Sequence, residues 1–177
     1  MFGCGPIGLL VVQLARQLAA GAVVATDPLP HRRQAALHAG ADQAWDPAED
    51  AALAGIGAVT GGLGVDVAFE VAGNQAAVDT AVAAVRPGGR VVVVGIPDDG
   101  RTTFEASPAR RKGLTIVLVR RMNEAYPRAI RMVTRGTVDL HALVSDWYPL
   151  EQAPSALAAA AGRAGLKTVV EPGRHTP

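Results

Sequence analysis

The stretch Gly3-Cys4-Gly5-Pro6-Ile7-Gly8 decides the fold, because it combines a glycine-rich turn with the start of a helix. Apolar residues continue from it at the spacing of one helical face, at Ile7, Leu10, Val11, Leu14 and Leu18. Gly21 marks the end of this helix, and residues 22–26 form a short β-favouring run. A glycine turn, a helix and a strand in this order are typical of a βαβ nucleotide-binding unit. Because an ordinary turn at the start of a helix can also contain glycines, this turn alone does not establish a nucleotide-binding unit.

An acid further along the chain supports such a unit. Asp27 ends the run at residues 22–26, about twenty residues after Gly8, which is the spacing of the dinucleotide fingerprint. In this fingerprint Gly3 permits the tight turn, Gly5 lets the backbone approach the pyrophosphate, and Gly8 lets the helix pack on the strand. The free amides and the dipole at the helix N-terminus attract the phosphates. The sequence therefore predicts a dinucleotide site.

Asp27 also predicts which dinucleotide binds. A carboxylate accepts hydrogen bonds from the adenosine ribose hydroxyls and repels a 2′-phosphate, so NAD is favoured over NADP. Two observations leave alternatives open: Asp27 could be only a turn acid before Pro28, and Arg32 and Arg33 lie close enough in sequence to clamp a 2′-phosphate. With Asp27 present, we expect Arg32 to lie along the adenosine.

Strands and helices alternate along the rest of the chain. The expected strands are residues 43–45, 65–71, 90–95 and 114–119, and the expected helices are residues 31–38, 47–53, 75–85 and 125–135. The strands are continuous apolar runs, which indicates parallel strands covered by helices on both faces. We therefore expect an α/β fold with a doubly wound parallel sheet, the Rossmann fold. Residues 55–64 are a Gly-rich passage, residues 97–108 are expected to form a polar loop, and residues 110–112 are interpreted as a solvated basic run.

The strand that should precede the glycine turn is reduced to Met1 and Phe2. This strand lies at the centre of a doubly wound sheet, and its loss would leave unpaired backbone groups on both neighbours. We therefore expect the chain to be part of a longer protein, or a gene model begun at an internal Met. Residues 1–146 are expected to form the truncated NAD-binding domain, and residues 147–177 a separate C-terminal segment. This segment should contain an extended piece at 147–149, a helix at 152–161 and a strand at 167–170.

Composition and charge exclude several classes of protein. The 177 residues, 49% of them hydrophobic, suffice for one well-buried domain. The net charge of +1 and the lack of a long basic stripe argue against nucleic-acid binding, and the helix at residues 7–20 is too short and polar for a membrane span. One cysteine and four unclustered histidines offer no metal site, so we assign no catalytic residue and no metal ligand, interpret Cys4 as a packing residue, and expect a cytoplasmic protein.

Beyond these patterns, the chain resembles the medium-chain dehydrogenase/reductase superfamily, in its zinc-dependent alcohol and sorbitol (polyol) dehydrogenase branch. The likeness runs nearly from end to end and corresponds to the C-terminal, NAD-binding portion of those proteins. The matching pieces are residues 3–8, 24–27, 39–42, 69–73, 86–90, 94–97, 110–112, 119–123 and 147–151. Each piece is weak alone, and their order and spacing together are specific.

The resemblance implies further cofactor contacts. It places Ile7 beside the pyrophosphate, and Asp27 and Arg32 at the adenosine ribose. It also implies that two segments line the nicotinamide: Val94, Gly95 and Ile96, and Leu118, Val119 and Arg120. Both segments fall at the carboxyl ends of expected strands, where open α/β sheets bind ligands.

The resemblance also implies an activity, which is hydride transfer between a secondary alcohol or polyol and NAD. Family members hold a catalytic zinc in an upstream domain, and no residue here matches its ligands, so this chain alone is expected to be inactive. The strand at residues 114–119 is expected to pair with its counterpart in a homodimer. Two alternatives remain, a non-catalytic nucleotide-binding or interaction module and an adenosylmethionine-dependent methyltransferase. The methyltransferase is disfavoured by the Pro6 turn and by the absence of an obvious antiparallel terminal hairpin.

Overall fold

A computed structural model describes residues 1–48, 51–120 and 124–173. The chain divides into two compact units, residues 1–125 and residues 126–177, which are described separately. The functional division expected between residues 146 and 147 stays a prediction.

The first unit is built on parallel strands. They are β1 (Val24–Thr26), β2 (Gln43–Trp45), β3 (Val65–Glu70), β4 (Val85–Val93) and β5 (Thr115–Leu118). β1 pairs with β2, and β4 lies between β3 and β5. Phe2 joins the two groups, because it forms parallel bridges with both Thr26 and Glu70. The resulting order, β2-β1-Phe2-β3-β4-β5, confirms the doubly wound arrangement of the Rossmann fold.

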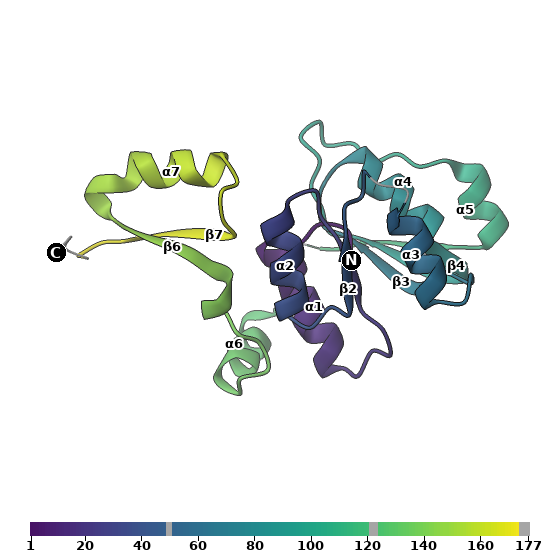
Figure 1. Ribbon diagram of the computed structural model, residues 1–177, viewed down its shortest axis with the longest axis horizontal. Helices are drawn as coiled ribbons and strands as arrows, with labels where there is room; N and C mark the ends of the chain where they lie inside the picture. Colours follow the sequence, from purple (N-terminus) through teal and green to yellow (C-terminus); the bar gives the residue numbers. More distant parts are fainter. Residues whose placement is uncertain (49–50, 121–123, 174–177) are drawn as a thin grey trace. The chain divides into compact units, whose positions relative to one another are not determined.

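Helices follow the strands and cover the sheet. They are α1 (Pro6–Gln17), α2 (Pro30–His38), α3 (Ala51–Val59), α4 (Gln75–Ala84) and α5 (Ala106–Lys112). Figure 1 shows α1 and α2 beside each other at one face of the strands, and α3, α4 and α5 at the other. The main core lies under this second group and contains Phe2, Val24, Ile56, Ala68, Ala81, Val82, Ala84, Val85, Val91, Val93 and Ala109.

Three expected boundaries in this unit are wrong. α3 continues through the Gly-rich passage to Val59, because Ala52 and Ile56 are buried and their packing outweighs the low helix propensity of glycine. β4 begins at Val85, directly after α4, and not at residue 90 as expected, so residues 87–89 fall inside the strand at a register shift. Residues 106–112 form α5 where a polar loop and a basic run were expected.

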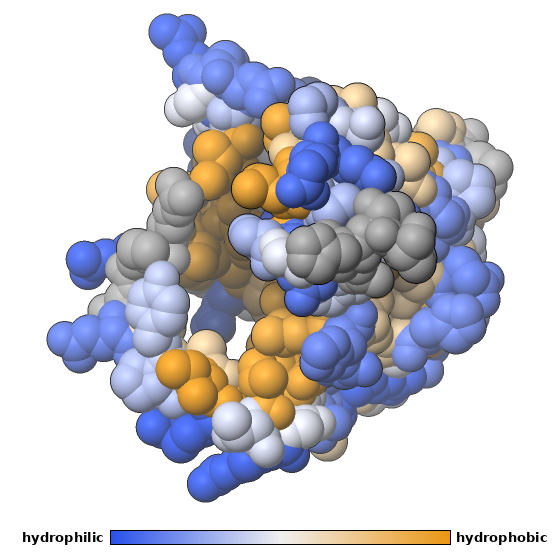
Figure 2. Space-filling model, turned by 90° about the vertical axis from the view of Figure 1, so that its left-hand side faces the viewer, coloured by the Kyte–Doolittle hydropathy of each residue, from blue (hydrophilic) through white to orange (hydrophobic). Residues whose placement is uncertain are grey.

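The second unit contains α6 (Tyr126–Thr134), a short helical turn at His141–Leu143, β6 (Val144–Pro149), a further turn at Leu150–Gln152, α7 (Ala153–Ala161) and β7 (Lys167–Glu171). β6 and β7 pair in parallel, and α7 connects them. Ile130, Leu150 and Leu157 of this unit are more than half exposed. Hydrophobic side chains open to solvent are visible on the face drawn in Figure 2. Among the described helices none has the length and apolar character of a membrane span.

Candidate dinucleotide site

Two positions of the glycine turn have no room for a side chain, and the first of them also has a left-handed backbone. Gly3 has a φ of +97°, and a Cβ there would lie 2.9 Å from the amide nitrogen of Ala72. A Cβ on Gly8 would collide with the carbonyl oxygen of Gly3. Gly5 is the N-cap of α1 and provides no side-chain cap, so the first amides of the helix stay available to an anion. The tight contacts of Gly3 and Gly8 agree with a turn built from glycines, and the contact of Gly3, Gly5 and Gly8 with a pyrophosphate stays a prediction.

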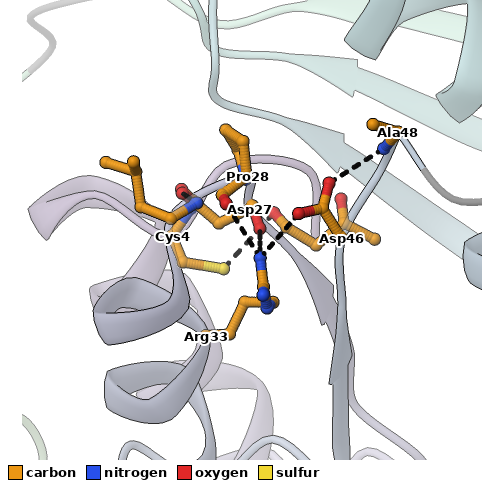
Figure 3. Close-up of polar contacts among 8 residues, drawn as sticks. Cys4, Asp27, Pro28, Arg33, Asp46 and Ala48 are labelled. Carbon is orange, nitrogen blue, oxygen red and sulfur yellow. Dashed lines mark hydrogen bonds and ion pairs between the residues drawn. The ribbon is translucent and has the colours of Figure 1, made fainter.

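Asp27 links the end of β1 to this turn. Its Oδ2 accepts a 2.8 Å hydrogen bond from the amide of Cys4, and its Oδ1 accepts a 2.9 Å bond from the amide of Leu29. The residue is only 4% exposed. Each carboxylate oxygen keeps further lone pairs, so the carboxylate is fixed in place and can still accept bonds from ribose hydroxyls. Figure 3 shows Asp27 between Cys4 and the residues that follow β1.

The two arginines near Asp27 have different surroundings. Nη1 of Arg33 donates to the carbonyl oxygens of Asp27 (2.8 Å) and Pro28 (2.9 Å) and to Oδ2 of Asp46 (3.0 Å). The Arg32 guanidinium lies toward the glycine turn instead, with Nη1 3.8 Å from the position that a Cβ on Gly5 would take. The sequence did not predict the ion pair between Arg33 and Asp46. The expected place of Arg32 along the adenosine stays a prediction.

Cys4 is buried inside the turn. Its thiol donates a 3.4 Å hydrogen bond to the carbonyl oxygen of Thr26. Burial, and secondly the nearby Asp27 carboxylate, raise the pKa of the Cys4 thiol to about 12. A cysteine is a nucleophile as its thiolate, so this thiol is inert at neutral pH, in agreement with a packing role.

Glu70 organises the carboxyl ends of β3 and β4, and sequence reasoning did not single it out. It is 1% exposed, and its carbonyl oxygen accepts bonds from the amides of Val94 (2.8 Å) and Gly95 (3.0 Å). Its Oε1 accepts a 2.7 Å bond from the amide of Gly73. A Cβ on Gly95 would lie 2.5 Å from Oε2 of Glu70, so glycine is required there. The available signal in the sequence was an acid that directly follows the apolar run at residues 67–69.

The residues expected at the nicotinamide share this edge of the sheet. The amide of Val119 donates a 3.0 Å bond to the carbonyl oxygen of Val93, which places residues 118–120 beside residues 94–96. Ile7, Ile96 and Leu118 are 58%, 74% and 74% exposed, and a bound cofactor would shield such apolar side chains. Arg120 is exposed and follows β5, and residues 121–123 lie outside the described part of the chain. Contact with the nicotinamide stays a prediction for both segments.

The described residues fit a dinucleotide better than a metal. A fixed carboxylate beside free helix amides suits a ribose and a pyrophosphate. No group of three or more His, Cys, Asp or Glu residues that could hold a metal ion occurs in the described ranges.

Comparison with curated proteins gives relatives along most of the chain. Sorbitol dehydrogenase of Bacillus subtilis (strain 168) is 37% identical over 157 residues, covering 89% of this chain and 44% of that protein. Sorbitol dehydrogenase of Macaca fascicularis is 31% identical over 171 residues, covering 96% and 48%. The chain thus spans about half the length of these curated relatives.

Solved structures of dehydrogenases are also similar to this chain over most of its length. Alcohol dehydrogenase TADH from Thermus sp. ATN1 superposes with a TM-score of 0.86 at 26% identity, covering 94% of this chain and 48% of that one. The 2R,3R-butanediol dehydrogenase from Bacillus subtilis gives a TM-score of 0.85 at 28% identity, covering 97% and 50%. The sequence profile of the zinc-binding dehydrogenases matches residues 6–135. The resemblance found in the sequence is confirmed, and the chain belongs to the zinc-binding dehydrogenase family.

Proposed function

We propose that this chain is the NAD(H)-binding portion of a zinc-type oxidoreductase that transfers a hydride between a secondary alcohol or polyol and NAD. The observation that carries the proposal is the position of Asp27, which is buried at the end of β1 and hydrogen-bonded to the glycine turn. This arrangement supports binding of an adenosine ribose next to a pyrophosphate. No specific observation favours the non-catalytic module or the methyltransferase.

Each part of the site has a proposed task. Gly3, Gly5, Ile7 and Gly8 bring the backbone and the start of α1 to the pyrophosphate, while Asp27 and Arg32 bind the adenosine ribose. Val94, Gly95, Ile96, Leu118, Val119 and Arg120 line the nicotinamide, which accepts the hydride when NAD is bound. The carboxyl ends of β4 and β5 support this placement, because open α/β sheets bind ligands at that edge.

Fluorescence titration with NADH and NADPH tests the cofactor. We expect tighter binding of NADH, because the Asp27 carboxylate accepts bonds from ribose hydroxyls and repels a 2′-phosphate. Asp27→Ala should reduce the difference between the affinities for NADH and NADPH. A matched control is Asp66→Asn, which removes an exposed carboxylate paired with Arg86 and should leave both affinities unchanged. Equal or tighter NADPH binding by the unmodified chain would contradict the proposal.

The polyol and alcohol substrates are inferred from the names of the relatives, sorbitol and butanediol dehydrogenases. We propose that residues 1–177 alone do not turn over such substrates, because the described residues offer no three-ligand zinc site of the kind that catalytic zinc requires. An assay of several polyols with NAD and added zinc checks this. Metal-dependent NADH production by the isolated chain would refute it.

Three further proposals concern the division into domains, the cellular location and the oligomeric state. Residues 1–146 serve as the NAD-binding domain, and residues 147–177 pack on the zinc-binding catalytic domain of a full-length protein. A cytoplasmic location is supported by the cysteine content, a single residue buried as a thiol. A homodimer through residues 114–119 is supported by the position of β5 at the end of the β3-β4-β5 order and by the exposure of Val117 (37%) and Leu118 (74%).

A further inference from the structure

The guanidinium of Arg33 could bind the 2′-phosphate of NADP, but it is paired with other groups of the protein. An arginine next to the ribose-binding acid is the group that accommodates a 2′-phosphate in dinucleotide sites. Nη1 of Arg33 lies 2.8 Å from the carbonyl oxygen of Asp27, so a guanidinium is present at the ribose end of the site. The preference for NAD therefore needs an explanation beyond the presence of Asp27.

The explanation lies in the partners of Arg33. Besides the carbonyl oxygens of Asp27 and Pro28, Nη1 contacts Oδ2 of Asp46, which follows β2. The two side chains of this ion pair are 23% and 22% exposed, so water screens the pair less than it would at an open surface. Asp46 is held in turn by the amide of Ala48, which donates a 3.0 Å bond to Oδ1. Figure 3 shows Arg33 directed toward Asp46 and the backbone after β1.

We propose that Asp46 is a specificity-determining residue, which holds the Arg33 guanidinium away from the 2′-phosphate of NADP. The inference rests on the proposed dinucleotide site. Asp27 repels the phosphate, and Asp46 withholds the cation that would otherwise attract it. In this proposal the preference for NAD is set by two carboxylates that follow the neighbouring strands β1 and β2.

The charges near the ribose end support this division of tasks. Asp27 and Asp46 contribute two negative charges, and Arg32 and Arg33 contribute two positive charges, so the four side chains sum to zero. Loss of one carboxylate leaves a net charge of +1 beside the expected position of the ribose. A 2′-phosphate gains from that change by direct pairing and by the local potential, while an unmodified ribose does not.

The test compares ADP-ribose with 2′-phospho-ADP-ribose by isothermal titration calorimetry, since both ligands lack nicotinamide and need no catalytic domain. Asp46→Asn removes the charge and keeps an oxygen that can accept the bond from the amide of Ala48. We expect the dissociation constant of the phosphorylated ligand, relative to that of ADP-ribose, to fall about fivefold, the scale of one partly screened charge pair. The double variant Arg33→Gln/Asp46→Asn should lose this gain. Asp66→Asn is the matched control and should change neither constant.

A second variant keeps the proposal testable if Asp46→Asn folds poorly in thermal melts. Arg33→Gln alone leaves the Asp46 carboxylate unpaired and should weaken 2′-phospho-ADP-ribose relative to ADP-ribose by less than about twofold, through the local potential only, because the paired guanidinium makes no direct contact with the phosphate. A loss of about fivefold or more in this variant would show that Arg33 already binds the phosphate, and an unchanged ratio in folded Asp46→Asn would equally overturn the proposal. Failure of the unmodified chain to bind ADP-ribose would instead reject the dinucleotide site, and the specificity proposal with it.

Discussion

The amide of Cys4 donates a 2.8 Å hydrogen bond to Oδ2 of Asp27, so the glycine turn and the end of β1 are joined within the protein itself. Asp27 therefore has a structural task in addition to its proposed contact with ribose. Asp27→Ala should lower the free energy of unfolding by about 1–3 kcal/mol, because one buried amide and one partly buried amide lose their acceptor. Asp27→Asn keeps one oxygen and should lose less. Urea denaturation without cofactor measures both, and full stability of Asp27→Ala would show that water replaces the carboxylate.

Glu70 should affect the nicotinamide half of the site more than the adenosine half. The bonds from Val94 and Gly95 go to the backbone carbonyl of Glu70, but its carboxylate fixes the amide of Gly73, whose backbone lies against Gly95 and Ile96. Glu70→Ala should weaken NADH binding about tenfold, equivalent to about 1.4 kcal/mol, and leave ADP-ribose binding nearly unchanged. Glu70→Gln can still accept the bond from Gly73 and should restore most of the affinity. An equal loss for both ligands would mean that Glu70 supports the fold as a whole.

A polypeptide made as residues 1–177 alone carries a free amine at Met1, and this amine should make the stability of that polypeptide depend on pH. Burial lowers the pKa of this amine from 8.0 to about 6, and the amine donates a 2.8 Å bond to the carbonyl oxygen of Val24. Between pH 6 and 8 the unfolded chain binds more protons at this group than the folded chain does. The free energy of unfolding therefore rises with pH across this window, by at most about 3 kcal/mol.

Denaturation at pH 6, 7 and 8 measures this dependence. The control is the same chain extended by a few residues before Met1, which removes the buried amine and leaves the histidines unchanged. The difference between the two chains isolates the amine. Identical pH profiles would contradict the prediction.

The sequence alone was sufficient to predict the glycine turn, the position of Asp27 after the first strand and the order of the strands. These features are local or periodic: the fingerprint lies within 27 residues, and the strands contain short apolar runs such as residues 67–69 and 91–94. Phe2 illustrates the limit of such reasoning. A single bridging residue completes the centre of the sheet, although the sequence retains only two residues before the turn.

Other features depend on contacts that no local pattern encodes. α5 was missed because its sequence, Ala-Ser-Pro-Ala-Arg-Arg-Lys, has no apolar periodicity and only Ala109 is buried. The ion pair of Arg33 and Asp46 joins residues 13 positions apart on different elements, and spacing alone does not predict it. For Glu70, the three amides it holds come from two separate loops, so its task became visible only when those loops were placed together.

Lys112 should contribute more to stability than its neighbours in the basic run. Its ammonium group donates to the carbonyl oxygens of Val82 (3.1 Å), Ala83 (2.7 Å) and Val85 (2.9 Å), and so caps the end of α4. Lys112→Met should reduce the free energy of unfolding by about 2 kcal/mol, since these acceptors lose a charged donor. Arg111→Met is the matched control, because among the contacts described Arg111 donates only to the exposed hydroxyl of Ser107. This substitution should change the free energy of unfolding by less than about 0.5 kcal/mol. Equal effects in urea denaturation would rule out a special role for Lys112.

The last prediction concerns the free edge of β5. The amide of Val119 donates to the carbonyl oxygen of Val93 in β4, and alternate amides of a strand point to opposite edges. The amides of Ile116 and Leu118 therefore point away from β4, toward an edge with no partner strand among the described residues. Pairing with a second copy across a two-fold axis would satisfy both free rows of backbone groups.

Proline at this edge tests the dimer without disturbing the pairing with β4. Ile116→Pro removes an outward donor, which an edge strand tolerates, and it should convert a dimer into a folded monomer. Ile116→Val keeps the amide and should remain dimeric. Val117→Pro instead removes an N–H that points toward β4, by the same alternation as Val119, and should impair folding. Size-exclusion chromatography with light scattering at micromolar concentration measures all three. A stable monomer for the unmodified chain, or an unchanged dimer in Ile116→Pro, would count against pairing through β5, because either result leaves the outward amides without a part in association.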